Sequence, residues 1–254
     1  MRTVYLDNSA TTRVCPEAAE AALQTMTEIY GNPSSLHSMG FAAEMVLKET
    51  REAVASLLSV PSAEVVFTSG GTEANNIALF GAAQAGRRNG ARIVTTAIEH
   101  PSVLRVMDEL KQHGFTVVTL APDCLGRIDP EQIRQAVTPD TILVSMMAVN
   151  NEIGTILPVQ AAAEAIRRSG SRALLHVDAV QAFGKIPLHP KKQGILSLIH
   201  ILLRCQKQLK KRIPPSSRAR ASWTAPDTVV LPLLPGAIST KTASSSVLIS
   251  SPSL

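Results

Sequence analysis

Aromatic residues make up only 3% of this sequence of 254 residues, and cysteine occurs three times, as Cys15, Cys124 and Cys205. No two cysteines have the CxxC spacing that is typical of zinc ligands, and their number and spacing do not suggest a disulfide framework. We therefore predict no metal site and expect the reducing cytoplasm as the compartment. The first seven residues lack the apolar segment of a signal peptide, which agrees with this expectation.

Long hydrophobic runs are also missing. The longest apolar run near the C-terminus, residues 195–203, is interrupted by Ser197 and His200. A helix that spans a bilayer needs about 20 predominantly apolar residues. The sequence therefore predicts no membrane partner.

Acidic residues are nearly absent from one part of the chain. Residues 196–254 contain eight basic residues and one acid, Asp227, which gives a formal charge near +7. Residues 1–195 contain 17 basic and 19 acidic residues, which gives a charge near −2. Because the excess positive charge is confined to the C-terminal segment, nucleic-acid binding by the folded part is not expected.

Strand and helix patterns alternate through residues 1–195. The expected strands are 65–68, 92–96, 116–120, 141–147 and 173–177, and the expected helices are 17–30, 36–59, 73–88, 103–113, 130–137 and 159–168. This alternation predicts an α/β domain with a mostly parallel sheet flanked by helices. Ligands of such sheets bind at the carboxyl ends of the strands.

The pattern changes abruptly after about residue 195. Residues 196–254 are basic and then rich in Ser, Thr and Pro, without a clear strand–helix unit. One interpretation is a disordered interaction tail. The other is translation in a wrong reading frame, which we favour because the change falls inside a domain and not at a linker. We expect an incomplete domain over 1–195 and an unrelated tail over 196–254.

Residues 68–76 join a short strand to a helix through two glycines. Gly71 lets the backbone approach a ligand, the helix N-terminus offers free N–H groups, and Thr72 adds a hydroxyl. This arrangement predicts a phosphate cradle without the lysine of a nucleotide-binding loop. The alternative is an ordinary turn in which Thr72 is the N-cap.

Polar residues follow three further expected strands. His100 could stack on a planar ring and move protons, or only cap a helix. Asn151 could bind a polar ligand, or close its strand with an Asx turn. Asp178 could hold a pyridine nitrogen protonated, with Gln181 near the phenolic oxygen of the ring, or Asp178 could be a helix cap. Together these groups are what pyridoxal 5'-phosphate (PLP) requires.

Nearly all of residues 3–195 resemble the cysteine desulfurases of the class V aminotransferase family, NifS/IscS type. The segments that carry the resemblance are 5–12, 31–37, 68–73, 96–100, 149–154 and 176–181. The resemblance implies the large domain of a fold-type I PLP transferase. It also implies removal of sulfur from L-cysteine, which gives L-alanine and an enzyme persulfide for iron–sulfur cluster or thio-cofactor assembly. The family's partners are a second copy of the chain and a sulfur acceptor or iron–sulfur scaffold protein.

The resemblance also implies roles for single residues. Gly71 and Thr72 would bind the phosphate, His100 would stack on the ring and be catalytic, and Asp178 would pair with the pyridine nitrogen. Asn151 and Gln181 would contact the ring oxygen. These roles agree with those that the residue types suggest by themselves.

Departures from the family pattern begin near residue 195. The family carries a Ser-Gly-His-Lys segment roughly two dozen residues beyond the aspartate, and its lysine forms the Schiff base with PLP. Residues 197–204 contain no lysine, and the family's catalytic cysteine belongs to a portion that is not found here. Arg204 cannot replace the lysine, because a guanidinium stays protonated. We expect this chain to be inactive.

Two other functions stay open. The first is another class V PLP enzyme, such as a selenocysteine lyase or an aminotransferase. The second is a non-catalytic truncated paralogue that binds a partner through its basic tail.

Overall fold

A five-stranded parallel sheet forms the centre of the computed structural model, which describes residues 4–199 and 229–231. The order of its strands is β3-β2-β4-β5-β6. Their bounds are Arg92–Thr96 for β2, Thr116–Leu120 for β3, Thr141–Met147 for β4, Leu174–Asp178 for β5 and Ser197–Ile199 for β6. A separate antiparallel pair joins β1, Val66–Thr68, to β7, Val229–Leu231.

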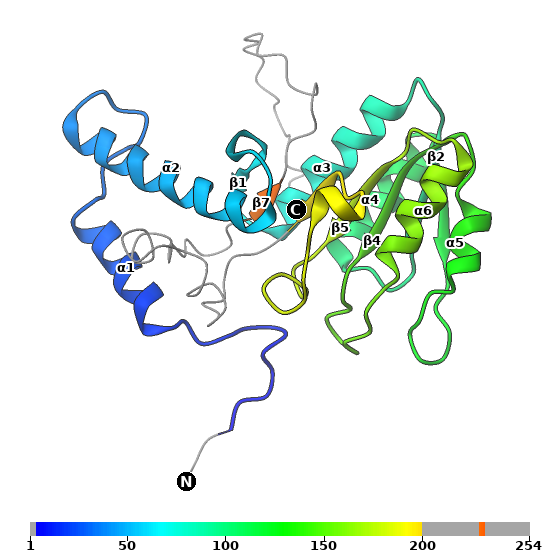
Figure 1. Ribbon diagram of the computed structural model, residues 1–254, viewed down its shortest axis with the longest axis horizontal. Helices are drawn as coiled ribbons and strands as arrows, with labels where there is room; N and C mark the ends of the chain where they lie inside the picture. The colour runs from blue at the N-terminus through cyan, green and yellow to red at the C-terminus, as the bar shows by residue number, and fades with distance from the viewer. Residues whose placement is uncertain (1–3, 200–228, 232–254) are drawn as a thin grey trace, which may run out of the picture.

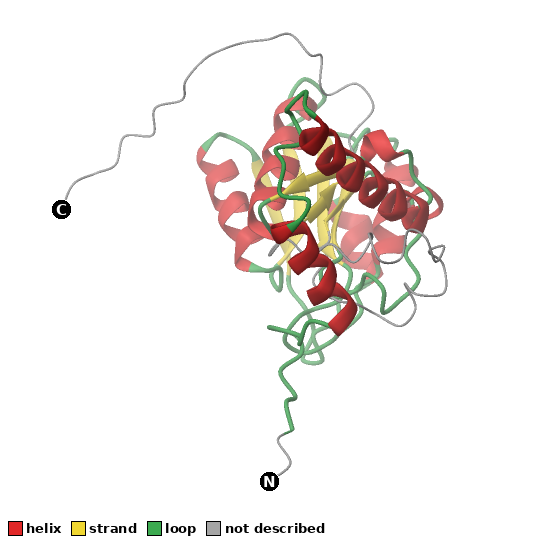
Figure 2. Ribbon diagram, turned by 90° about the vertical axis from the view of Figure 1, so that its left-hand side faces the viewer, coloured by secondary structure: helices red, strands yellow, loops and turns green. Residues whose placement is uncertain are grey.

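Helices cover both faces of the sheet, as Figures 1 and 2 show. Their bounds are Pro16–Thr27 for α1, Ser38–Leu58 for α2, Gly71–Gly86 for α3, Pro101–Gln112 for α4, Pro130–Ala136 for α5, Val159–Ser169 for α6 and Pro190–Gln193 for α7, with a 3₁₀ turn at Ser62–Glu64. Helices α3 and α4 pack on one face, and α5 and α6 on the other. Helices α1 and α2 extend to one side of the sheet (Figure 1).

The sequence of the strands explains this two-sided core. Successive side chains of a strand point to opposite faces, so a strand that is covered on both sides is expected to be largely apolar along its whole length. In β2, Ile93 packs into the cluster with α3 and α4, whereas Val94 packs into the cluster with α5 and α6. All seven residues of β4 are buried, as its central position requires.

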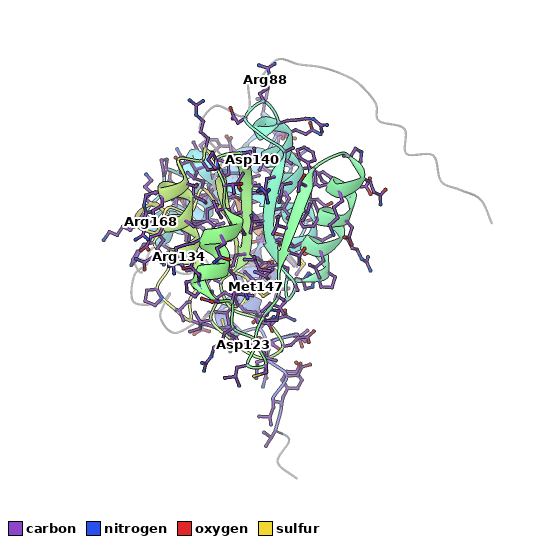
Figure 3. The ribbon with its side chains drawn as sticks, turned by 90° about the vertical axis from the view of Figure 1, so that its right-hand side faces the viewer. Arg88, Asp123, Arg134, Asp140, Met147 and Arg168 are labelled. Carbon is purple, nitrogen blue, oxygen red and sulfur yellow. The ribbon has the colours of Figure 1, made fainter. Side chains whose placement is uncertain are left out.

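Parallel strands bring their carboxyl ends to one end of the sheet. Figure 3 shows this polarity: Asp140, which precedes β4, lies at the end opposite to Met147, its last residue. Strands β2 and β5 run in the same direction as β4. The segments that begin at Ala97, Ala148 and Ala179 therefore leave the sheet at the same end.

The structure confirms the α/β class and the parallel sheet. Strands β2, β3 and β4 have the predicted bounds, whereas β5 lies one residue later than predicted and α3 begins two residues earlier. Strand β6 begins at Ser197, inside the segment that the sequence assigned to the tail. Of that tail, residues 200–228 and 232–254 lie outside the described residues, and residues 229–231 form β7.

Two further observations concern expectations from composition. Cys124 is an exposed free cysteine, but Cys15 is in a disulfide, which the spacing of the cysteines did not predict. None of the helices in the described part of the chain is both long enough and apolar enough to cross a lipid bilayer.

Candidate functional site

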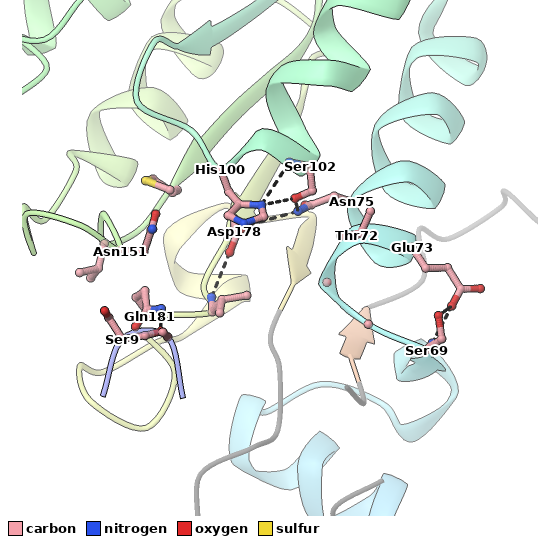
Figure 4. Close-up of a pocket in the computed structure, with 16 residues that line it drawn as sticks. Ser9, Ser69, Thr72, Glu73, Asn75, His100, Ser102, Asn151, Asp178 and Gln181 are labelled. Atoms are coloured by element: carbon pink, nitrogen blue, oxygen red, sulfur yellow. Dashed lines mark hydrogen bonds between the residues drawn. The ribbon is translucent and has the colours of Figure 1, made fainter. Parts of the chain in front are cut away.

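A pocket of about 520 Å³ opens at the carboxyl end of the sheet (Figure 4). All six residues that the sequence singled out line this one cavity. The lining consists of Ser9, Ala10, Ser69, Gly70, Gly71, Thr72, Glu73, Asn75, His100, Ser102, Met147, Val149, Asn151, Asp178, Val180 and Gln181. Among the predicted residues, the side chains of Thr72 and Gln181 lie 109 positions apart in the sequence and still face one space.

The N-terminus of α3 forms one wall of the pocket. The helix begins at Gly71, and Gly70 is its N-cap, so Thr72 lies inside the first turn and is not the cap. Gly70 offers no side chain to the first-turn N–H groups. The carboxylate of Glu73 instead accepts hydrogen bonds from the Ser69 hydroxyl, at 2.6 Å, and from the Ser69 N–H, at 2.5 Å. These two bonds lower the pKa of Glu73.

His100 belongs to the start of α4 and faces the pocket at the same time. It is the N-cap of this helix, and its Nδ1 accepts a hydrogen bond from the Ser102 N–H at 3.1 Å. The hydroxyl of Ser102 lies 2.8 Å from the same nitrogen. The capping role and the pocket-lining position are thus compatible, because the helix uses one ring nitrogen only.

Asp178 is the last residue of β5 and is buried. Its Oδ1 accepts a hydrogen bond from the Val180 N–H at 3.0 Å, and its Oδ2 accepts one from Asn75 Nδ2 at 3.2 Å. Burial raises the pKa of this carboxyl, and the two hydrogen bonds and the neighbouring His100 oppose the shift only in part. Both oxygens of the carboxylate are thus held by hydrogen bonds at the end of β5.

Asn151 and Gln181 line the opposite part of the pocket. The Asx turn after β4 is made by Asn150, whose Oδ1 accepts hydrogen bonds from the N–H groups of Glu152 and Ile153. Asn151 is therefore not needed for that turn. Gln181 is half-buried and donates from Nε2 to the carbonyl of Ser9, at 3.0 Å.

Sequence reasoning missed Asn75, Ser102, Glu99 and His176. Asn75 lies three residues after Thr72, so both lie on one face of α3, and this spacing was a usable signal. Glu99 is buried and lies outside the lining of the pocket. Its Oε1 accepts hydrogen bonds from the Thr96 hydroxyl, at 2.6 Å, and the Met147 N–H, at 2.9 Å. Burial raises the pKa of Glu99 to about 8.

The donor set of the pocket suits an organic phosphate with a protonated ring nitrogen better than a metal ion. A helix N-terminus with a hydroxyl attracts an anion, and a buried carboxylate attracts a cationic N–H group. Within residues 4–199 and 229–231, no three His, Cys, Asp or Glu side chains form a group that could hold a metal ion.

Residues 4–198 match the family described as Aminotransferase class-V. The chain belongs to this family. This class V chain is 42% identical over 210 residues to the cysteine desulfurase NifS of Azotobacter vinelandii, which covers 82% of this chain and 50% of the relative. It is 43% identical over 197 residues to the cysteine desulfurase of Trichormus azollae, with 77% and 48% covered. Within this PLP-dependent family, the chain is similar to NifS and IscS. It spans about half the length of these relatives.

Solved structures give the same result for the fold. The class V chain superposes on a NifS-like protein with a TM-score of 0.79 and 34% identity, which covers 92% of this chain and 60% of the other. It superposes on a structure titled SspA in complex with cysteine with a TM-score of 0.77 and 28% identity, with 91% and 61% covered.

Proposed function

We propose that this pocket binds PLP and that the chain is the cofactor-binding part of a cysteine desulfurase. The observation that carries the proposal is the shared cavity of Thr72, His100 and Asp178, which come from three separate strand ends. An anion-binding helix terminus, a flat ring and a buried carboxylate match the phosphate, the ring face and the ring nitrogen of PLP.

The contacts of Asp178 supply a test of fit. Two hydrogen bonds reach its carboxylate, and both come from uncharged donors, a backbone N–H and an amide. Burial of the carboxyl raises its pKa, so its charged form lacks full compensation. A protonated pyridine nitrogen would provide that compensation. The residues present therefore fit the cofactor.

The proposed roles follow from these positions. The first-turn N–H groups of α3 and the hydroxyl of Thr72 would bind the phosphate, and Gly71, which has no side chain, would let the phosphate approach the backbone. His100 would lie against the ring face and move a proton, and Asp178 would hold the ring nitrogen in its protonated form. Asn151 and Gln181 would bind the ring oxygen. Bound PLP supplies an electron sink for bond breaking at the substrate.

For a full-length enzyme that contains this cofactor-binding part, we propose L-cysteine as substrate. Several curated relatives are named cysteine desulfurase, and one solved structural relative is titled as a complex with cysteine. The products would be L-alanine and a persulfide on the enzyme, passed to a sulfur acceptor or an iron–sulfur scaffold protein. The chain would act as a homodimer, as the family resemblance implies.

We further propose that the chain with this sequence binds PLP without turning over. Residues 197–204, where the family has its Schiff-base lysine, contain none. No lysine is found among the residues that line the pocket in the described part of the chain. An arginine cannot supply the amine, because it remains protonated.

Equilibrium dialysis of the full chain against PLP and against pyridoxal, which lacks the phosphate, tests the proposal. We expect saturable binding of PLP and binding of pyridoxal that is weaker by roughly tenfold or more, since the helix terminus binds the phosphate. Equal affinity for the two compounds would contradict the phosphate cradle. With L-cysteine and PLP, we expect no sulfide release above that of free PLP; enzyme-dependent release would contradict the predicted inactivity.

A further inference from the structure

A network of hydrogen bonds in the wall of the pocket connects His100 with Asp178 through Ser102 and Asn75 (Figure 4). Asn75 lies at its centre. The Asn75 Nδ2 atom lies 2.8 Å from Ser102 Oγ and 3.2 Å from Asp178 Oδ2. The Asn75 Oδ1 atom lies 3.0 Å from His176 Nε2. Asn75 and His176 are each 1% exposed, so water cannot replace these partners.

The direction of each hydrogen bond follows from one backbone group. The N–H of Ser102 can only donate, so the His100 Nδ1 atom that receives it carries no proton. The Ser102 hydroxyl, 2.8 Å from that nitrogen, must therefore donate to it as well. Ser102 Oγ is then an acceptor toward Asn75, which requires the NH₂ group of Asn75 at that position.

The same reasoning gives the directions of the remaining hydrogen bonds, between Asn75, His176 and Ser197. With its NH₂ group shared between Ser102 and Asp178, Asn75 turns its carbonyl oxygen toward His176. A carbonyl only accepts, so His176 must carry a proton on Nε2. Burial lowers the pKa of His176 to about 3, so the ring is neutral and its Nδ1 accepts from the Ser197 hydroxyl at 3.0 Å.

We propose that Asn75 is a positioning residue that holds the Asp178 carboxylate and, through Ser102, keeps His100 as the tautomer with its proton on Nε2. His176 sets the orientation of the Asn75 amide. This role rests on the proposed function, because it prepares one ring and one carboxylate for the same cofactor. The amide of Asn75 thus aligns both Asp178, which is proposed to bind the ring nitrogen, and His100, which is proposed to stack on the ring face.

Imidazole nitrogen shifts test the hydrogen-bond directions without any cofactor. The full chain is labelled with ¹⁵N-histidine, and the signals of His100 and His176 are assigned by their loss in His100→Gln and His176→Gln. We expect both rings to be neutral at pH 7.5 with the proton on Nε2. A proton on Nδ1 of either ring, or exchange-averaged shifts, would overturn the proposal.

Matched variants test the effect on the site. Asn75→Leu removes the amide, and Asn76→Leu makes the same change one residue later, at a half-buried position whose amide donates to a backbone carbonyl of its own helix. We expect the dissociation constant for PLP to rise by roughly tenfold or more in Asn75→Leu, because a hydrogen bond to a charged group is lost, and to change less than twofold or so in Asn76→Leu. Equal effects of the two substitutions would overturn the proposal.

A second pair guards against failure of Asn75→Leu to fold. Gln in place of His176 keeps an N–H donor for the Asn75 carbonyl, whereas Leu removes it. We expect His176→Gln to bind PLP as the unsubstituted chain does and His176→Leu to bind it more weakly; identical affinities would count against the proposal. If the unsubstituted chain binds no PLP, the proposed function fails, and the imidazole tautomers still decide the hydrogen-bond directions.

Discussion

The carboxyl of Glu99 links two strands at the base of the pocket: its Oε1 lies 2.9 Å from the backbone nitrogen of Met147, the last residue of β4. Glu99 follows β2, so this contact joins the ends of neighbouring strands. Its other oxygen, Oε2, is buried with no hydrogen-bond partner among the described residues. A proton on the carboxyl would reduce the cost of this burial, which agrees with the pKa of about 8.

The first prediction concerns stability at alkaline pH. The pKa of Glu99 rises from an ordinary 4.5 to about 8 in the folded protein, so the folded state holds this proton more tightly between these pH values. The protonated Glu99 carboxyl therefore contributes most to the free energy of unfolding below pH 4.5. This contribution is lost as the pH rises through 8, by at most about 1.4 kcal/mol per pH unit. Glu99→Gln mimics the protonated form and should remove this loss.

Denaturant unfolding of the unsubstituted chain and of Glu99→Gln from pH 6 to pH 9 checks this prediction. We expect Glu99→Gln to gain stability relative to the unsubstituted chain as the pH rises. Glu109→Gln, at an exposed position on α4, is the control and should leave the slope nearly unchanged. A constant difference between Glu99→Gln and the unsubstituted chain would show that Glu99 is ionised in the folded protein.

The second prediction concerns acid. The pKa of His176 falls from 6.5 to about 3 in the folded protein because the ring is buried. The unfolded chain therefore binds the proton more tightly, and the stability that is present above pH 6.5 is lost as the pH falls toward 3. His176→Gln cannot be protonated and should lose less stability between pH 6.5 and pH 4.5. Thermal melts at several pH values measure this, and parallel curves would refute it.

The third prediction concerns the ring nitrogen. Asp178→Asn removes the negative charge, keeps the size of the side chain and leaves one oxygen to accept from the Val180 N–H, while its NH₂ group faces the amide of Asn75. We expect the affinity for PLP to fall by roughly tenfold to a hundredfold. Asp108→Asn is the matched control, since Asp108 is exposed and pairs with Lys111 at the surface. Dialysis equilibrium measures both variants. Unchanged affinity in Asp178→Asn would contradict the assigned role of the carboxylate.

The fourth prediction concerns the core. Leu143 lies in the central strand β4 and is 0% exposed, so Leu143→Ala should destabilise the protein by about 2–5 kcal/mol through lost burial and a cavity. Leu23 on α1 is 59% exposed, and Leu23→Ala should cost less than about 0.5 kcal/mol. Denaturant midpoints compare the two. Similar losses would mean that β4 is not the centre of the core.

Much of the fold could be predicted because its strands have strong local signals. Strand β4 is seven consecutive buried residues, and β2 and β3 are β-branched runs that end at turns, so their bounds were predicted correctly. Helix starts were less accurate. Glycine is a poor helix former, so the start of α3 at Gly71 was missed, although Gly70 is its cap.

The pocket could be predicted in outline, because each polar motif follows a strand and parallel strands end together. The residues that hold Asp178 and His100 in place could not be predicted in the same way. Asn75 and His176 are ordinary polar residues within a helix and a strand, and their importance depends on a contact across 101 positions. Glu99 was passed over for the same reason, since its partner Met147 belongs to another strand.

The contact between Asn75 and Asp178 joins positions 103 residues apart in the sequence. Contacts of long sequence separation form late and slowly during folding. Partly folded forms of the chain therefore have no complete pocket, and a ligand that requires both residues binds the finished domain alone. Such a ligand would slow unfolding without guiding the early steps of assembly.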